Sequence, residues 1–548
     1  MKLRSKLLYA TLVVAFLFSS VALVQTGDLY FQIKKQLTIF GDVYKEVATL
    51  YVDEVSPEKL MKSSIDAMLQ KLDPYTVFIA EGEQQDMEIL STGSYGGVGI
   101  EVGFRGDDIV VIAPMEGYAA DRAGIRPGDI LKAINGVSAE GLAIEEVQEL
   151  TIGDTGTTVK LLIQRPSTNR TTSYELERER IEVKNISFTE RLGENNDLLY
   201  LQLSRFGQQS GEEVRELLLN SREEDHLNGL ILDLRNNPGG LLNEAVEIID
   251  KFIEPGVTVV ETQGRMEEQN GAYVSEEPAI FDDLPVIILM NRGSASASEV
   301  VAGALQDLDR AVIIGESSFG KGLVQTIRPL SYNTSLKLTV SKYLTPSGRS
   351  IQSVDYAGEN GGIGSQIPDS LRRPFKTKNG RTVFDGQGID PDVVVNDSLE
   401  SEAEISLLQS NHIFFFVNEK LAAIDDESPE LPPNIFDQFV DYLNEQNFEY
   451  STPADEYINE LETYVEQSSN NDRIREDISN LKRSLSQQKQ QEILSSKNFI
   501  ENSIEKEWIS QVHGRDERNR ISLQEDGYVR KAVELLLDND SYQSILKP

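Results

Sequence analysis

Residues 286–299 read VIILMNRGSASASE. The first five are apolar and largely β-branched or aliphatic, which is typical of a strand buried on both faces. A turn of small residues follows, and residues 300–308 continue with helical character. A buried strand that passes through a short turn into a helix is the repeating unit of α/β domains.

The same alternation extends outward from this segment, over residues 171–397. Apolar strand-like runs alternate there with helical stretches, which predicts a multidomain protein with an α/β domain at its centre. We expect strands at 198–203, 230–234, 286–290, 312–314 and 336–340, and helices near 211–220, 241–253 and 298–308.

The regions on either side have a different character. Residues 26–90 show apolar positions at helical spacing, which predicts an N-terminal helical region. Residues 91–170 are rich in glycine and contain short strand-like runs, so we expect a small β-rich module there. Residues 398–548 are polar, acidic and helical in pattern, and form a C-terminal extension.

Composition excludes several classes of protein. The chain has 548 residues, 39% of them hydrophobic, which suits a globular protein of several domains. A formal net charge of −38 opposes general affinity for nucleic acid or anionic lipid. The chain contains no cysteine, so thiol catalysis, cysteine zinc sites and disulfides are excluded.

The N-terminus has the pattern of an export signal. Lys2, Arg4 and Lys6 precede an uncharged run over residues 7–24, and small residues permit a cut after Ala22. The run is also long enough to span a bilayer, so residues 1–25 form either a signal peptide or an uncleaved membrane anchor. We therefore expect an exported protein of the periplasm or cell envelope.

The small-residue turn is the strongest candidate for chemistry. A serine between a buried strand and a helix has a fixed position and lies at the positive end of that helix. Ser294, Ser296 and Ser298 could alternatively be helix-capping residues, although one cap accounts for one serine only. Because the chain has only His226, His412 and His513, none in a suitable setting, a serine–histidine triad is improbable and another base is needed.

Lys321 is the candidate base. It lies in the stretch GESSFGKGLVQ (residues 315–325), which partly fits a phosphate-binding loop and a Ser-x-x-Lys motif. Both motifs require a helix, whereas Gly320 and Gly322 oppose one and the residues that follow alternate like a strand. Burial can lower a lysine pKa from about 10.4 far enough to leave a proton acceptor near pH 7. Gln325 could orient the amine.

A third segment, LILDLRNNPGGL (residues 230–241), follows the same strand–turn–helix pattern. Glycine amides in its turn could bind a substrate oxyanion. A tight structural turn is an equally good interpretation of this segment by itself.

Taken together and in this order, the three segments resemble the motifs of the carboxyl-terminal processing (tail-specific) peptidases, a Ser/Lys family with a crotonase/ClpP-like α/β core. The resemblance implies that Ser296 is the nucleophile, Lys321 the base and Gln325 its partner. It also implies that Ala297 and either Gly239 or Gly240 supply the oxyanion amides. No metal or organic cofactor is implied.

The resemblance covers roughly residues 40–395, including the β-rich module, which looks like the PDZ domain inserted in this family. Its carboxylate-binding loop would comprise Tyr95, Gly96, Gly97, Val98 and Gly99. Glycine amides there could capture the C-terminus of a protein substrate while the peptide adds as a β-strand.

The implied function is that of a serine endopeptidase that recognises C-terminal tails. Two rival interpretations are a catalytically silent PDZ scaffold in the envelope and a crotonase-like enzyme acting on thioesters. Residues 398–548 match no catalytic motif. They could cap the PDZ groove, mediate self-association, dock an adaptor or form a stabilising helical layer.

Overall fold

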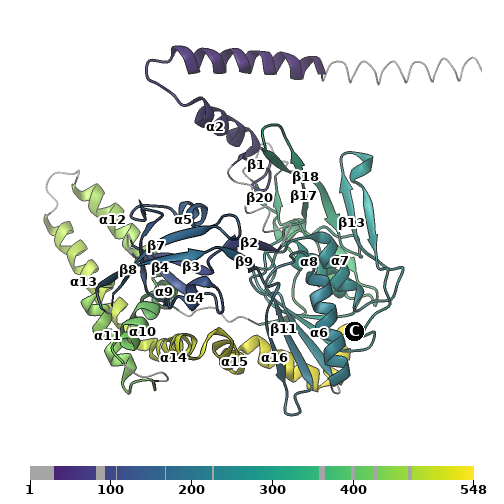
Figure 1. The fold of residues 1–548 in the computed structure, drawn as a ribbon. Coiled ribbons are helices and arrows are strands. Elements are labelled where there is room, and N and C mark those ends of the chain that lie inside the picture. Colours follow the sequence, from purple (N-terminus) through teal and green to yellow (C-terminus); the bar gives the residue numbers. More distant parts are fainter. Residues whose placement is uncertain are drawn as a thin grey trace, which may run out of the picture. The chain divides into compact units, whose positions relative to one another are not determined.

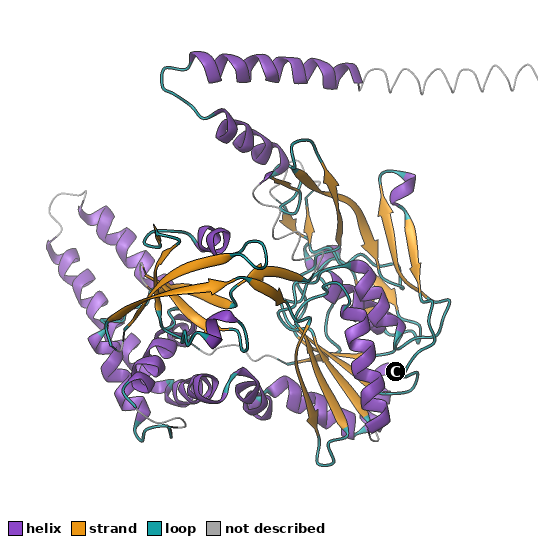
Figure 2. Cartoon of the chain, viewed as in Figure 1, coloured by secondary structure: helices purple, strands orange, loops and turns teal. Residues whose placement is uncertain are grey.

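The computed structural model describes residues 30–81, 93–105, 108–166, 168–224, 227–356, 364–395, 401–424, 429–466 and 472–547. The predicted signal or anchor over residues 1–25 therefore lies outside the described residues. The helices within the described ranges are all too short or too polar to cross a membrane. The chain divides into two compact units. Many of their elements are labelled in Figure 1, and Figure 2 colours them by type.

The smaller unit contains residues 30–81, 325–339, 356 and 364–365 of the described chain. A helix over residues 30–50 and helix α2 (Pro57–Leu69) lie within the region where the sequence predicts helices. The Ser56 hydroxyl caps α2 by accepting from the Lys59 amide at 3.3 Å. Strand β1 (Val77–Ile79) pairs antiparallel with residues 335–337 at the start of β18 (Ser335–Leu344).

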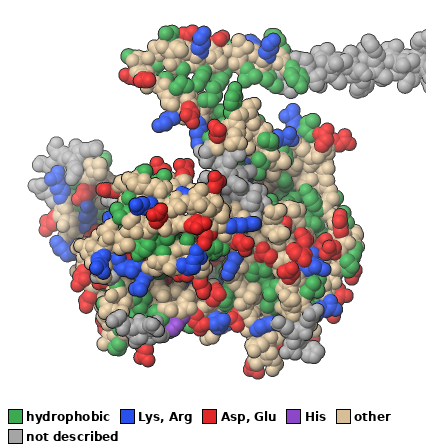
Figure 3. Space-filling model, in the orientation of Figure 1, with side chains coloured by type: hydrophobic (Ala, Val, Ile, Leu, Met, Phe, Trp, Pro, Cys, Tyr) green, Lys and Arg blue, Asp and Glu red, His purple; other side chains and the backbone are tan. Residues whose placement is uncertain are grey.

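Apolar side chains of the 30–50 helix are exposed in this unit (Figure 3). They include Tyr30, Phe31, Leu37, Phe40 and Val43, which are between 44% and 74% exposed. The helical periodicity in the sequence therefore predicts the helix correctly, but these positions do not form a core within the described chain.

The larger unit is built on a six-stranded sheet in the order β10-β11-β12-β15-β16-β23. Neighbouring strands from β11 to β23 run parallel, and β10 is antiparallel to β11. The strands are β10 (Ile186–Leu192), β11 (Leu198–Leu203), β12 (Gly229–Asp233), β15 (Val286–Met290), β16 (Val312–Gly315) and β23 (Val393–Val394). Four of the five strands expected in the α/β domain belong to this sheet, and the fifth, expected at 336–340, falls in β18 of another sheet.

Both faces of this sheet are covered, which is why its strands are apolar at every position. On one face, alternate residues such as Leu232 and Ile288 pack beneath helices α6 (Ser210–Glu224), α7 (Leu242–Asp250) and α8 (Ala297–Asp307). These three helices lie close to the expected positions.

The opposite face is covered by helices from the far end of the chain. Residues of α16 (Gly527–Leu537) and α17 (Asn539–Leu546) form one core cluster with Ile231, Ile287 and Ile314 of the sheet. The Tyr542 hydroxyl lies 3.0 Å from both the amide and the carbonyl oxygen of Val286. The core layer thus extends across the predicted domain boundary at 397.

Further β-structure lies beside the sheet in the larger unit. Strands β13 (Thr258–Gly264) and β14 (Gly271–Val274) are antiparallel, and β13 also pairs with residues 341–344 of β18. Strands β21 (Pro374–Lys376) and β22 (Thr382–Phe384) form a short hairpin. Strand β17 (Leu323–Pro329) begins after the loop that contains Lys321, and its residues from Gln325 onward belong to the smaller unit.

The β-rich module has its own core and two sheets. The larger sheet has the order β3-β4-β5-β7-β8, with β6 paired to β5, and the smaller one pairs β2 with β9. The elements are β2 (Ser94–Gly97), β3 (Ile100–Arg105), β4 (Asp108–Pro114), α4 (Ala119–Arg122), β5 (Ile130–Ile134), β6 (Val137–Ser138), α5 (Ile144–Thr151), β7 (Thr158–Arg165), β8 (Arg170–Glu177) and β9 (Glu179–Glu182). Because β8 and β9 complete these sheets, the module continues past the predicted boundary at residue 170.

The remaining C-terminal helices form a bundle that contacts this module. They are α9 (Glu402–Gln409), α10 (His412–Ala422), α11 (Ile435–Glu445), α12 (Pro453–Glu466), α13 (Asp472–Ser495), α14 (Lys497–His513) and α15 (Arg515–Glu525). The Asn418 side chain donates to the Pro127 carbonyl at 2.5 Å, and the Arg105 guanidinium lies 4.6 Å from the centre of the Phe415 ring. The extension is therefore in contact with both the module and the core sheet.

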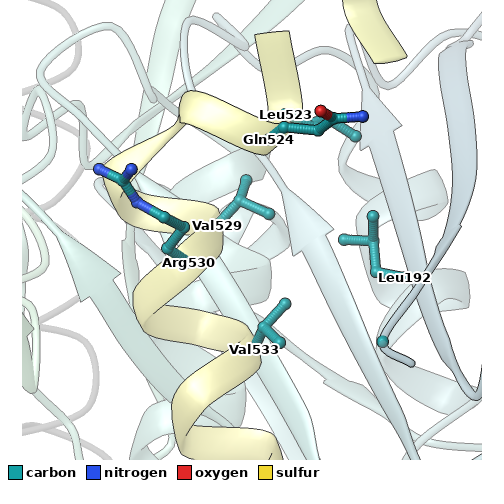
Figure 4. Close-up of a pocket in the computed structure, with 7 residues that line it drawn as sticks. Leu192, Leu523, Gln524, Val529, Arg530 and Val533 are labelled. Atoms are coloured by element: carbon teal, nitrogen blue, oxygen red, sulfur yellow. The ribbon is translucent and has the colours of Figure 1, made fainter. Parts of the chain in front are cut away.

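A shallow pocket of about 240 Å³ lies where α15 and α16 meet the end of β10 (Figure 4). Its lining is mainly apolar and comprises Leu192, Gly193, Leu523, Gln524, Val529, Arg530 and Val533. None of these residues belongs to the three segments that the sequence singles out for chemistry.

Candidate active site

Three loops follow β12, β15 and β16, which are adjacent parallel strands. The carboxyl ends of such strands meet at one edge of the sheet, the usual place for a site in an α/β protein. We call residues 234–240 the Arg235 loop, residues 291–296 the Ser296 loop and residues 316–322 the Lys321 loop. The structure thus brings all three predicted segments to the same edge.

Ser296 has an unusual backbone conformation. Its φ is 56° and its ψ is −114°, and α8 begins at the next residue. A positive φ is rare for a residue with a side chain and costs energy, so it persists only where the surroundings impose it. The half-buried Ser296 is therefore held at a sharp strand-to-helix turn.

The two flanking serines have structural roles. Both are fully buried. The Ser294 hydroxyl donates to the Leu234 carbonyl at 2.8 Å, and the Ser298 hydroxyl donates to the Asn237 carbonyl at 2.9 Å. They fasten the Ser296 loop and the start of α8 to the Arg235 loop. Geometry therefore distinguishes Ser296 from its neighbours, which the spacing of the serines does not.

Glu299 is an important residue that the sequence reasoning missed. Its fully buried carboxylate accepts from the Ser296 amide at 2.8 Å and from the Lys321 amide at 2.9 Å, both at Oε2. Its other oxygen, Oε1, accepts from the Gly320 amide at 2.7 Å and from the Ser318 hydroxyl at 2.5 Å. Burial raises the pKa of Glu299, and these hydrogen bonds oppose that rise.

A tyrosine connects the same two positions from another side. The Tyr343 hydroxyl lies 3.2 Å from the Ser296 carbonyl oxygen and 2.6 Å from the Lys321 carbonyl oxygen. Tyr343 is only 2% exposed. The backbones of Ser296 and Lys321 are thus fixed relative to each other through their amides and through their carbonyls.

The Lys321 loop leads into a strand, β17, and not into a helix. This confirms that residues 315–325 form neither a phosphate-binding loop nor a helical Ser-x-x-Lys motif. Lys321 is half-buried. Gln325 belongs to the smaller unit, where its side-chain amide donates to the Thr339 hydroxyl at 3.3 Å. A contact between Gln325 and Lys321 stays a prediction.

The two candidate oxyanion glycines have different surroundings. Gly239 has a φ of 98°, and a methyl group added to it would lie 2.9 Å from Ser296 Cβ. The Gly239 amide already donates a hydrogen bond to Asn237 Oδ1, at 2.9 Å. A methyl group on Gly240 would lie 2.2 Å from the Phe206 carbonyl oxygen. Ala297 is the first residue of α8, where amides have no acceptor within the helix.

The predicted carboxylate-binding loop lies at the start of an edge strand. Tyr95, Gly96 and Gly97 belong to β2 and pair with β9. Val98 is buried, and Gly99 has a φ of 71° that favours glycine. The loop leads into β3, which is at the edge of the five-stranded path of its sheet.

The histidines lie away from these loops or outside the described residues. His412 is in α10 beside the Phe448 ring, with ring centres 4.8 Å apart, and His513 ends α14. His226 is not among the described residues. Within the described ranges, His, Asp and Glu side chains do not cluster in a way that could hold a metal ion.

Comparison with known families agrees with this arrangement. Residues 197–358 match the family described as "Peptidase family S41", and residues 110–165 match "PDZ domain". Residues 403–536 match "Probable PDZ-protease, C-terminal helical domain". The family matches thus extend into the C-terminal extension.

Two curated relatives and one solved structure illustrate the similarity. A "Carboxy-terminal-processing protease" of Bartonella bacilliformis is 38% identical over 323 residues, which cover 58% of this chain and 73% of the relative. A "Probable CtpA-like serine protease" of Staphylococcus aureus is 36% identical over 311 residues, covering 57% of this chain and 61% of the relative. The structure of a "photosystem II D1 C-terminal processing protease" is 28% identical with a TM-score of 0.34, covering 61% of this chain and 92% of that one.

The sheet-edge loops, the PDZ module and the extent of the Bartonella match lead to one conclusion. The chain belongs to the carboxy-terminal-processing proteases of peptidase family S41, which are serine-type peptidases with a PDZ domain.

Proposed function

We propose that the protein is a serine endopeptidase that captures the C-terminal tail of a protein substrate and cleaves peptide bonds with a Ser296–Lys321 dyad. The observation that carries the proposal is the shared acceptor of these two residues, because one buried carboxylate fixes both of their amides. A nucleophile and its base must keep a constant separation, and a shared rigid acceptor supplies that constraint.

In the proposed reaction, neutral Lys321 takes the proton from the Ser296 hydroxyl as Oγ forms a bond to the substrate carbonyl carbon. The carbonyl oxygen becomes negative. The C–N bond then breaks, and the Lys321 ammonium returns the proton to the leaving amine. Water, deprotonated by Lys321, then attacks the ester carbonyl carbon. The bond from that carbon to Oγ breaks, and the Lys321 ammonium returns the proton to Oγ as the new C-terminal acid leaves. This cycle uses no metal or organic cofactor.

We assign the developing oxyanion to the amides of Ala297 and Gly240. The Ala297 amide is at the helix start, where an unpaired donor and the helix dipole both favour negative charge. Gly240 is preferred over Gly239 because the Gly239 amide is already engaged by Asn237. In this assignment Gly239 has a separate role: the absence of a side chain lets the Arg235 loop approach Ser296.

The PDZ module is proposed to select substrates by their C-termini. The glycine-rich loop ending at Gly99 could offer amides to a terminal carboxylate, and the edge strand β3 could pair with the preceding residues. Substrates would be proteins with accessible apolar tails and unfolded segments near the cleavage site.

We further propose that the core has the crotonase/ClpP-like arrangement and that Gln325 assists Lys321. Export to the periplasm or cell envelope, by a leader or anchor at residues 1–25, is part of the same proposal. The competing function, a catalytically silent PDZ scaffold, would have no need for a strained serine beside a buried carboxylate.

The test follows cleavage of an unstructured protein with an apolar C-terminus by wild type, Ser296→Ala and Lys321→Ala. Wild type should cut it, and both variants should fall to background while keeping wild-type melting temperatures. Mass spectrometry of wild type with a slow ester substrate should show an adduct on Ser296. Equal turnover by all three proteins would rule out the dyad, and inactivity of all three would favour the scaffold.

A further inference from the structure

The first turn of α16 lies against the loops of the proposed active site, although it follows Lys321 by about 200 residues in the sequence. Asp526 is the N-cap of this helix, and its Oδ1 accepts from the amides of Tyr528 and Val529 at 2.9 and 3.1 Å. Its other oxygen, Oδ2, pairs with the Arg235 guanidinium at 2.8 Å. One carboxylate therefore starts α16 and holds the Arg235 loop.

Tyr528 makes two further contacts from the same turn. Its ring lies beneath the Arg235 guanidinium, 4.9 Å from ring centre to the guanidinium carbon. Its hydroxyl donates to Glu316 Oε1 at 3.2 Å. Tyr528 itself is buried, with 4% of its surface exposed.

The two residues that Asp526 and Tyr528 contact, Arg235 and Glu316, belong to different loops. Arg235 lies in the loop that contains Gly239 and Gly240. Its guanidinium also donates to the Asp233 carboxylate, which accepts from the Tyr200 hydroxyl at 2.6 Å. Glu316 begins the Lys321 loop, and its Oε2 lies 3.3 Å from Nε of Arg292 in the Ser296 loop. Asp526 and Tyr528 thus contact two of the three loops directly and reach the third through Glu316.

We propose that Asp526 and Tyr528 are positioning residues for peptide cleavage, so that the C-terminal extension completes the active site. They keep the Arg235 and Lys321 loops in register, and with them the oxyanion amides and the base. This inference rests on the proposed function for its kinetic test. The extension is then neither an accessory domain nor only a stabilising layer.

The chain offers a matched control for each residue. Asp526→Asn keeps an oxygen that can cap α16 but loses the charge that pairs with Arg235. Asp538→Asn makes the same change at the N-cap of α17, where the carboxylate bonds to Ser541. Tyr528→Phe removes the bond to Glu316. Tyr542→Phe removes a hydroxyl that bonds to Val286 at the start of β15, the opposite end of that strand from the Ser296 loop.

The kinetic test measures kcat, KM and melting temperature of the full-length variants. We expect kcat to fall about 10-fold in Asp526→Asn and in Tyr528→Phe, with KM within about twofold of wild type, because only the geometry of the reacting groups changes. The controls should keep wild-type kcat, even where Tyr542→Phe lowers the melting temperature. Equal kcat in variants and controls would overturn the proposal.

Hydrogen–deuterium exchange separates this inference from the proposed function. Asp526→Asn and Tyr528→Phe should exchange faster than wild type in peptides covering residues 234–241 and 315–322, and the controls should not. If wild type and Ser296→Ala are both inactive, the proposed dyad is contradicted. Faster exchange in these loops of Asp526→Asn and Tyr528→Phe would still support positioning by α16. Unchanged exchange in both variants would overturn the positioning role whatever the activity.

Discussion

The backbone amides of Ser296 and Lys321 donate to the same atom, Oε2 of Glu299, at 2.8 and 2.9 Å. The two residues lie on loops that follow different strands, and the carboxylate between them is fully buried. Its four hydrogen bonds supply the compensation that a buried carboxylate needs. The spacing between the backbones of Ser296 and Lys321 is therefore fixed by a third side chain.

Glu299→Gln should abolish most activity. In either orientation of the glutamine side chain, its amide nitrogen would face two hydrogen-bond donors. Two buried donors would then lose their acceptor, which should lower the free energy of unfolding by about 2–5 kcal/mol. We expect kcat/KM to fall at least about 100-fold, measured by steady-state cleavage. Glu244→Gln is the control, because Glu244 is also buried but accepts from the amides of Gln209 and Gly211 at the start of α6. A similar loss of kcat in that control would show that the effect is general destabilisation.

The three serines of the turn should separate into two classes. Ser294→Ala and Ser298→Ala each remove a buried hydrogen bond to the Arg235 loop and should lower the free energy of unfolding by about 1–3 kcal/mol while retaining activity. Ser296→Ala should retain stability and lose activity. Urea denaturation and cleavage assays on the same preparations measure both quantities. Full activity in Ser296→Ala would contradict the assignment.

Gly239→Ala should damage catalysis more than it damages binding. The new methyl group would lie 2.7 Å from the Ala295 carbonyl oxygen and 2.9 Å from Ser296 Cβ, and the φ of 98° is unfavourable for alanine. The Ser296 loop must shift, so kcat should fall by at least about 10-fold with little change in KM. Gly348→Ala is the control, since its φ of 84° is similar but its surroundings are open. Equal kcat in Gly239→Ala and wild type would show that close approach is unnecessary.

His412 should make stability depend on pH. Burial, and the nearby charge of Arg105, lower the pKa of His412. The folded state therefore favours the neutral ring, whereas the unfolded chain takes up a proton below its own pKa of about 6.5. The stability contributed by this residue should therefore fall as the pH drops below about 6.5.

His412→Phe should flatten that dependence, because it keeps the aromatic contacts with Phe448 and Tyr442 but cannot titrate. His513→Gln, at an exposed position in the last turn of α14, is the control. Chemical denaturation at several pH values measures the slope. An unchanged slope in His412→Phe would assign the pH dependence to other groups.

Removal of residues 398–548 should leave an insoluble or unfolded protein. The truncation would expose one entire face of the core sheet, including Ile231, Ile287 and Ile314, which α16 and α17 cover. The measurements are solubility and circular dichroism of the truncated chain. A folded, active product would show that the second layer is dispensable and that the extension restrains activity instead.

The sequence predicts the core sheet well because its signal is local. The run at residues 286–290 is apolar at every position, and the structure explains this by the two covered faces of β15. The turn at Ser296 and the strand after Lys321 follow from small residues and alternation that are visible in short windows. The three loops meet because they follow neighbouring parallel strands, which the α/β pattern also predicts.

Other features of the site have little or no signal in a short stretch of sequence. Glu299 stands three residues after Ser296, the spacing of a capping box, so a local signal existed for its bond to the Ser296 amide. Its bond to Lys321 joins residues 22 positions apart and depends on the packing of two loops. The contact between Asp526 and Arg235 spans almost 300 residues, and an acidic helical segment shows no pattern that points to one arginine.

The placement of α16 and α17 on the core sheet also has a consequence for the order in which the protein matures. Strands β10 to β16 leave the ribosome more than 200 residues before the helices that cover their second face. Until those helices arrive, the apolar face stays open and Arg235 lacks Asp526. Under the proposed role of Asp526 and Tyr528, the site becomes complete only after nearly all of the chain has been synthesised.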